Sequence, residues 1–112
     1  MVYEKMKNNY DYYFIVLGEI PKKLSRYLSG FFKESPYHID ISPTLIDLDP
    51  AVRITITSGT NTNNSFYLGL VFYILLEDNC TYYKPFGIDS DVRYTEEDVL
   101  AFIISTLLNS DH

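Results

Sequence analysis

Hydrophobic and polar residues alternate in two stretches near the middle of the chain. Residues 37–42 place apolar side chains on one side and polar side chains on the other, and residues 52–57 repeat this two-residue period. Such alternation is typical of a β-strand with one buried face and one solvated face. Pro43 cannot donate a backbone hydrogen bond within a sheet, so it predicts an edge, a bulge or a break in the first strand.

Residues 66–76 are apolar at both odd and even positions. A strand with two apolar faces is usually central in its sheet and covered on both sides, and we expect this for residues 66–76. Gly69 within the segment indicates a bulge or a close approach of another group to the backbone. Residues 77–79 predict a turn, and residues 81–83 a short returning strand.

Two segments have the spacing of helices. After Pro21, apolar residues recur at three- and four-residue steps, which predicts an amphipathic helix that ends near Lys33, before Pro36. A second helix is predicted to begin after Thr95, its N-cap, with Asp98 completing a variant of the capping box. It is apolar around almost its whole circumference, so we expect one of its sides to face a second subunit. The residues expected at this dimer interface are Leu100, Ile104 and Leu108.

Residues 12–17 form a short apolar run before Gly18, which we interpret as a buried strand. Residues 1–11 are expected to form a flexible or helical arm. The predicted order is therefore β-α-β-β-β-β-α. Consecutive strands flanked by helices indicate an α+β fold, with an antiparallel sheet of four to five strands and two flanking helices. A chain of 112 residues is expected to form one domain over residues 1–112.

Charge is distributed unevenly along the chain. Residues 1–34 carry six basic and four acidic side chains, whereas residues 35–112 carry three basic and eleven acidic ones, for a net charge of −6. An acidic surface repels phosphate backbones and attracts basic partners. We therefore expect no direct binding to nucleic acid, and a protein partner with a basic surface.

The composition also bears on compartment. The longest uncharged apolar run, residues 66–76, has eleven residues, whereas a membrane-spanning helix needs roughly 20. The N-terminal residues lack the apolar core of a secretory signal. A single cysteine, Cys80, excludes an intramolecular disulfide and fits a reducing compartment. We expect no membrane association and a cytoplasmic location.

The aromatic content is high in tyrosine, with 11 Tyr, 7 Phe and no Trp. Two explanations are open. The codon usage of an AT-rich genome favours Tyr and Phe, whereas a tyrosine-rich recognition surface would use the large contact area that Tyr offers at low entropic cost.

Few residues suggest a cofactor or a metal. The five glycines are too dispersed for a phosphate-binding loop, and one Cys with two His does not provide a zinc-binding spacing. The acidic pairs at residues 47 and 49 and at residues 89 and 91 lack the Gly and the distal Glu of a calcium-binding loop. We expect no cofactor and no metal.

The one arrangement that resembles a catalytic set is His38, Asp40 and Ser42. These residues share one face of a predicted strand. Residues in line along a strand do not converge on a single point, which argues against a catalytic triad. The chain is therefore predicted not to be an enzyme.

We interpret the chain as a small, acidic, non-enzymatic binding or inhibitor protein that occupies the surface of a protein partner, as a homodimer. One such protein is a phage or mobile-element inhibitor of a host nucleic-acid enzyme, of the anti-restriction or anti-CRISPR type. Its acidic surface would act as a DNA mimic in the host cytoplasm and compete with nucleic acid. The residues predicted to contact the partner are Asp89, Asp91, Glu96, Glu97, Asp98, Tyr82 and Tyr83.

Two alternatives remain open. The first is a chaperone- or immunity-type protein that sequesters one partner through apolar contacts. The second is a small hydrolase-like enzyme that uses His38 and Asp40. Salt separates the first alternative from the DNA mimic, because ionic strength weakens electrostatic contacts and leaves apolar contacts almost unchanged.

Overall fold

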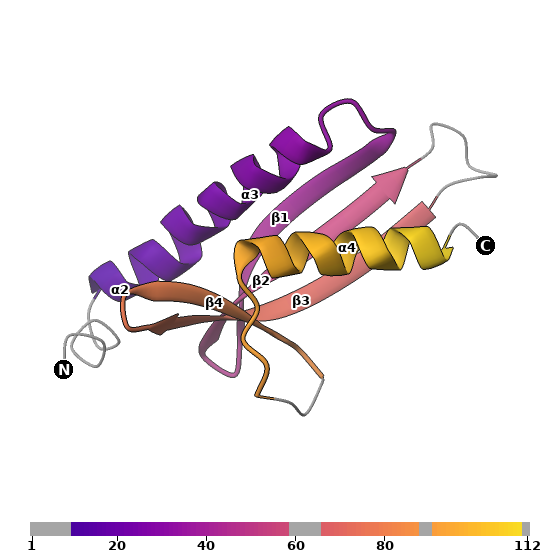
Figure 1. Cartoon of the computed structure of the whole chain (residues 1–112). Coiled ribbons are helices and arrows are strands. Elements are labelled where there is room, and N and C mark those ends of the chain that lie inside the picture. The colour runs from indigo at the N-terminus through magenta and orange to yellow at the C-terminus, as the bar shows by residue number, and fades with distance from the viewer. Residues whose placement is uncertain (1–9, 59–65, 88–90, 111–112) are drawn as a thin grey trace.

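The protein is an elongated α+β domain in which a four-stranded antiparallel sheet packs against helices (Figure 1). The computed structural model describes residues 10–58, 66–87 and 91–110. The strands follow one another across the sheet, and the predicted α+β class, antiparallel sheet and final helix are confirmed. The elements are β1 (Tyr37–Ile46), β2 (Asp49–Ser58), β3 (Phe66–Glu77), β4 (Cys80–Pro85), α3 (Ile20–Phe31) and α4 (Glu96–Ser110).

The first element is helical, so the strand predicted over residues 12–17 is wrong. Helix α2 (Tyr10–Phe14) continues through a π-helical turn, η1 (Ile15–Glu19), directly into α3. The wide turn lies just before Pro21, which has no N–H and whose ring displaces the carbonyl four residues earlier. Of the predicted arm, residues 1–9 lie outside the described residues.

A stripe of buried side chains explains why this segment is a helix. Its members recur at four-residue steps, the spacing at which side chains share one face of a helix. The strand interpretation failed because a short apolar run has no period of its own, and the four-residue period emerges only when the run is read together with α3. The buried residues are Tyr12, Val16, Ile20, Leu24, Leu28 and Phe32.

The core lies between one face of the sheet and the two long helices. Alternate residues of β2 and β3 point into it, together with one residue of β4. In Figure 1, α3 runs alongside β1 and α4 crosses the sheet, where Phe102 meets Phe72 of β3 edge to face. The residues contributed by the sheet are Val52, Ile54, Ile56, Phe72, Ile74 and Tyr83, and those contributed by α4 are Val99, Leu100, Ile103 and Leu107.

The two edges of the sheet are built differently. Pro43 lies in the edge strand β1, one of the positions predicted for it. At the other edge, Tyr83 of β4 exchanges two backbone hydrogen bonds with Tyr94, at N···O distances of 2.7 and 2.9 Å. This bridge holds the segment before α4 against the outer side of β4.

Strand β3 is internal, as predicted, but the described helices cover only one of its faces. Its even-numbered residues from Leu68 to Leu76 join the core, whereas the odd-numbered residues lie on the opposite side and are half-buried or exposed. Tyr67, at 69% exposure, is the extreme case. The prediction that both faces of β3 are covered is therefore wrong for the part of the chain that the structure describes.

Each of the two hairpins is closed by one tight turn of two residues. Residues 47–48 join β1 to β2, and residues 78–79 join β3 to β4, as expected for the second turn. All four residues have positive φ angles, between 51° and 72°. Such angles at both central positions are those of a type I′ turn, whose twist matches that of the flanking strands.

Candidate interaction surface

The side of the sheet opposite the helices, which we call the open face, carries aromatic, aliphatic and cationic side chains. It is formed by residues that alternate with the core positions, and the antiparallel register places them side by side. Its apolar members lie on β3, on β4 and just after β4. The aromatic, aliphatic and cationic residues of the open face are Arg53, Tyr67, Val71, Tyr73, Leu75, Tyr82, Lys84 and Phe86, and the same face also carries His38, Asp40, Ser42, Thr55 and Thr57 on β1 and β2.

The aromatic side chains of the open face are held in place by local contacts. The ring of Tyr73 lies 5.9 Å from the ring of Phe86, centroid to centroid, at an interplanar angle of 39°. Phe86 keeps its position because its N–H donates to the Val71 carbonyl at 2.9 Å, which extends the β3–β4 ladder past Pro85. Phe86 is nevertheless exposed, so the pair presents apolar area to the outside.

Gly69 accommodates the most exposed ring of the open face. The register between β2 and β3 continues across Gly69 without a bulge. A Cβ atom at this position would lie 3.3 Å from the Tyr67 hydroxyl and 3.5 Å from its Cε1. The Tyr67 ring therefore lies over the bare backbone of Gly69, which is the close approach predicted for this glycine.

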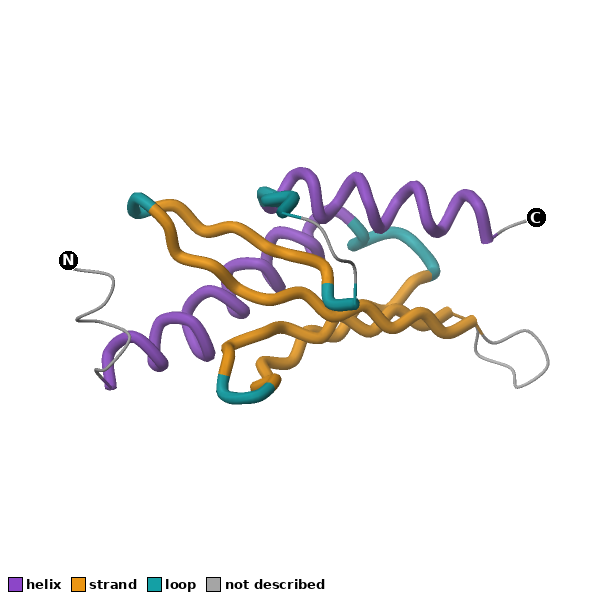
Figure 2. Tube along the Cα trace, turned by 90° about the horizontal axis from the view of Figure 1, so that it is seen from below, coloured by secondary structure: helices purple, strands orange, loops and turns teal. Residues whose placement is uncertain are grey.

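The open face adjoins a cavity at one end of the sheet. The β2–β3 ladder ends at Ala51 and Tyr73, because the next residue of β2 is Pro50, which has no N–H to donate. Beyond this point β3 pairs with β4 alone, and the two hairpins diverge (Figure 2). A cavity of about 400 Å³ lies at this fork. It is lined by Tyr12, Asp49, Pro50, Tyr73, Ile74, Leu75 and Lys84.

This cavity, which we call the fork cavity, is lined by both polar and apolar groups. Its lining includes the acid Asp49, the cation Lys84 and the tyrosines Tyr12 and Tyr73. Polar atoms make up the larger part of this lining, unlike the mostly apolar lining that is typical of small-ligand pockets.

The predicted acidic contact residues on α4 have roles within the fold. The Thr95 N–H donates to Asp98 Oδ2 at 3.0 Å, and the Asp98 N–H donates to Thr95 Oγ1 at 3.2 Å. The predicted capping box is therefore confirmed. Glu96 Oε1 lies 3.8 Å from Nζ of Lys23, linking α4 to α3. Glu97 is exposed.

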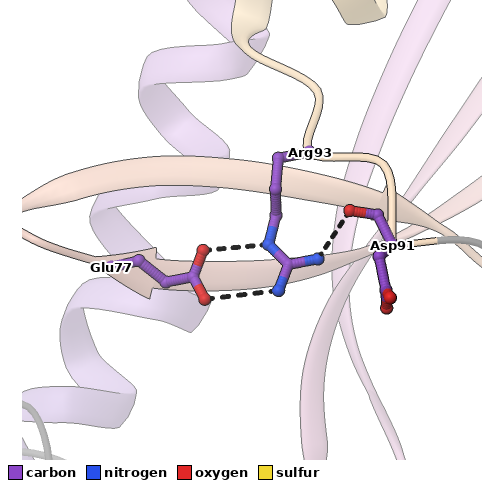
Figure 3. A network of polar contacts seen from close by, with 3 residues as sticks. All are labelled: Glu77, Asp91 and Arg93. Carbon is purple, nitrogen blue, oxygen red and sulfur yellow. Dashed lines mark hydrogen bonds and ion pairs between the residues drawn. The ribbon is translucent and has the colours of Figure 1, made fainter.

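The acids before α4 are arranged around Arg93 (Figure 3). Arg93 donates to both carboxylate oxygens of Glu77, at 2.9 and 3.4 Å, and its Nη1 donates to the Asp91 carbonyl at 3.0 Å. The hydrogen bond from Arg93 lowers the pKa of the Glu77 carboxyl below its usual value. The side chain of Asp91 is exposed, and Asp89 lies outside the described residues.

The two predicted tyrosine contacts lie on different faces of β4. Tyr82 is half-buried on the open face, where the neighbouring Cys80 raises its pKa. Tyr83 is 0% exposed, so the prediction that it contacts a partner is wrong. Among the residues that the structure describes, none forms a hydrogen bond with its hydroxyl, and burial, with a smaller effect of Glu96, raises its pKa.

The three residues expected at a dimer interface differ in exposure. Leu100, at 8% exposure, packs in the chain's own core, where a second subunit cannot reach it. Ile104 is half-buried against the same core. Leu108 is 62% exposed near the end of α4. Of the predicted interface, Ile104 and Leu108 remain accessible.

The candidate catalytic residues lie along β1 and do not form a pocket. His38, Asp40 and Ser42 are all exposed. The Ser42 hydroxyl lies 3.4 Å from Asp40 Oδ2. Because a strand rises about 3.3 Å per residue, the backbones of His38 and Ser42 are roughly 13 Å apart. Within the residues that the structure describes, no group of three His, Cys, Asp or Glu side chains is placed to hold a metal.

Comparison with known proteins identifies no relative. No family model, no curated protein and no solved structure matches this chain. Among the helices of the described ranges, none is both long and apolar enough to cross a membrane. Evidence on function therefore comes from the residues and the shape of the protein surface.

Proposed function

We propose that this chain is a non-enzymatic binding protein that sequesters a protein partner on its open face. The observation that supports this is the mismatch at β3. The strand is internal and apolar on both faces, yet the helices that the structure describes pack against only one of them. An apolar sheet face is normally covered, and the missing cover is supplied by the partner.

The composition of the open face favours a protein as the partner. Tyr and Arg are the residues most enriched among the energetically dominant contacts of protein interfaces. Tyr67 and Phe86 are exposed and Tyr73 is half-buried; across the sheet, Tyr67 lies opposite Thr57 and Tyr73 lies opposite Lys84. Covering apolar area stabilises a complex by about 25 cal/mol per Å² before the costs of association.

Apolar contacts fit the arrangement better than competition with nucleic acid does. Asp98 forms the helix cap, and Glu96 lies beside Lys23. The acids that would imitate phosphates are thus partly committed within the fold. The open face carries two cations, Arg53 and Lys84, beside the acid Asp40, within a chain of net charge −6. The proposal is therefore the chaperone- or immunity-type alternative, and the acids supply long-range attraction to a basic partner.

The test begins with a photo-reactive amino acid in place of Tyr67, in the full chain and in the cell that makes it. The protein captured at this position is identified, purified and titrated against wild type and variants. Tyr67→Ser with Phe86→Ser is expected to weaken binding by about 100-fold, because two exposed aromatic anchors are removed. The matched control is Leu108→Ser, which removes an exposed apolar side chain from α4.

Salt and charge variants separate the two modes of binding. Apolar contacts predict a dissociation rate that changes little between low and high salt. Glu97→Gln with Asp91→Asn is expected to slow association and to leave dissociation almost unchanged. Unchanged binding by the Tyr67 and Phe86 variant, together with steep loss of affinity in salt, would contradict the proposal and favour the acidic surface.

A further inference from the structure

Leu48 and Asn79 hold the same position in two turns of the same geometry. Each is the second residue of a two-residue hairpin turn, with φ angles of 72° and 63°. This left-handed conformation suits Gly, Asn and Asp, because Gly has no Cβ and the short polar side chains bond to the nearby backbone. Asn79 meets that requirement. Leu48 does not, so its backbone is strained.

Burial within the chain does not compensate for the strain at Leu48. Its side chain is 78% exposed, the highest value among the large hydrophobic residues that the structure describes. Leu45, on the same hairpin, is 48% exposed. A polar residue or glycine at position 48 would relieve the strain and remove exposed hydrocarbon. The leucine therefore costs stability while most of its side chain stays exposed, a combination that marks a functional position.

The neighbours of Leu48 indicate what it contacts. Asp47 and Asp49 flank it on both sides, and both are exposed. Two carboxylates beside the apolar tip oppose insertion into an anionic membrane surface or contact with nucleic acid. They favour a protein pocket that is apolar inside and bordered by Lys or Arg. Asp49 also lines the fork cavity, so the tip is continuous with the end of the open face.

We infer that the tip of the β1–β2 hairpin, Leu48 with its flanking Asp47 and Asp49, inserts into an apolar pocket with a basic rim on the protein partner. The inference rests on the proposed function, since it assigns a second contact to the same partner. In this arrangement the open face supplies the broad contact and Leu48 the anchor. The two acids orient the tip toward the basic rim.

The decisive variants are Leu48→Gly and its matched control Asn79→Gly. Glycine adopts positive φ without strain, so both variants keep their turns and both are expected to fold. Leu48→Gly is expected to raise the thermal midpoint and yet to weaken binding to the partner captured at residue 67 by about 30-fold, the loss typical of a dominant contact. Asn79→Gly is expected to bind like wild type. Opposite changes in stability and affinity cannot result from misfolding.

Several outcomes would overturn the inference and leave the proposed function standing. In one such outcome, Leu48→Gly binds the partner with wild-type affinity while the variant with Tyr67→Ser and Phe86→Ser still loses binding. A lower thermal midpoint for Leu48→Gly than for wild type is another, because it would give the side chain a role inside the fold. A photo-reactive residue at position 48 that captures lipid, a second copy or no protein also contradicts it.

A separate variant tests whether the partner's pocket has a basic rim. Asp47→Asn with Asp49→Asn removes both charges and keeps residues that tolerate turn conformations. This variant is expected to associate with the partner about tenfold more slowly at low salt, with its rate less dependent on ionic strength. An unchanged association rate would contradict the inference that the partner's pocket has a basic rim.

Discussion

Arg93 and Glu77 form a two-pronged ion pair across sixteen residues of the chain, with the shortest contact, Nε to Oε1, at 2.9 Å (Figure 3). The pair joins the end of β3 to the segment that leads into α4. One residue further on, Tyr94 bridges to Tyr83 of β4. Together these contacts determine where α4 starts on the core, although nothing in the local sequence pairs these segments.

The ion pair predicts a pH dependence of stability. Because the hydrogen bond from Arg93 lowers the pKa of folded Glu77, its contribution is present above the unfolded pKa and is lost as pH falls through the folded pKa. Glu77→Gln is therefore expected to flatten the acid side of the stability profile, by a small amount because the pair is exposed. Denaturant titrations over the acid range measure this. Glu97→Gln is the control, and equal profiles for both variants would contradict the prediction.

Tyr83 predicts a stabilising substitution. Its hydroxyl is buried and has no hydrogen-bond partner in the described part of the chain, so the folded state loses the hydration of that group and gains no bond in return. Tyr83→Phe is expected to raise the free energy of unfolding by about 1 kcal/mol. Tyr82→Phe on the open face is expected to stay within roughly 0.5 kcal/mol of wild type. Destabilisation by Tyr83→Phe in denaturant titrations would show that the hydroxyl has an unseen partner.

The raised pKa of Tyr83 has a spectroscopic consequence. Burial disfavours the charged phenolate, so this tyrosine is expected to ionise only at a pH above that of exposed tyrosines. An alkaline absorbance titration of wild type should contain a late-titrating component whose amplitude is reduced in Tyr83→Phe. An unchanged late component in the variant would contradict this assignment.

The capping box predicts a coupled loss of stability. Thr95→Ala and Asp98→Ala each remove one of the two reciprocal hydrogen bonds at the start of α4. Each is expected to lower the free energy of unfolding by about 1 kcal/mol. The double variant is expected to lose less than the sum, because both bonds belong to one motif. Ser105→Ala, on the exposed side of the same helix, is the control; strict additivity would argue against a reciprocal cap.

Gly69→Ala is expected to move the Tyr67 ring on the open face without destabilising the sheet. The added Cβ would lie 3.3 Å from the Tyr67 hydroxyl, so the ring must move, and it can do so because it is largely exposed. Alanine in a strand is expected to stabilise the fold by about 0.5 kcal/mol or slightly more relative to glycine. NMR of the Tyr67 ring reports the displacement. A destabilised variant would mean that the ring cannot yield.

Local patterns in the sequence determined most of the elements. The two-residue period at residues 37–42 and 52–57 identifies β1 and β2, and Thr95 with Asp98 identifies the start of α4. Pro43 indicates an edge position. These signals depend on residues within a few positions of one another, where backbone geometry and hydrogen bonding decide the conformation. The run at residues 12–17 failed as a prediction because it is too short to contain a period.

Only the tertiary structure decided which surfaces are covered. The apolar pattern of β3 is the same on both faces, yet the helices dock on one face and leave Tyr67 outside. Tyr82 and Tyr83 are adjacent in sequence, and the register of β4 with β3 places Tyr82 on the open face and Tyr83 in the core. The strain at Leu48 likewise exists only because the hairpin closes with two residues. Coverage, register and turn closure depend on contacts between distant segments, and these carry no signature in a local pattern of hydrophobic and polar residues.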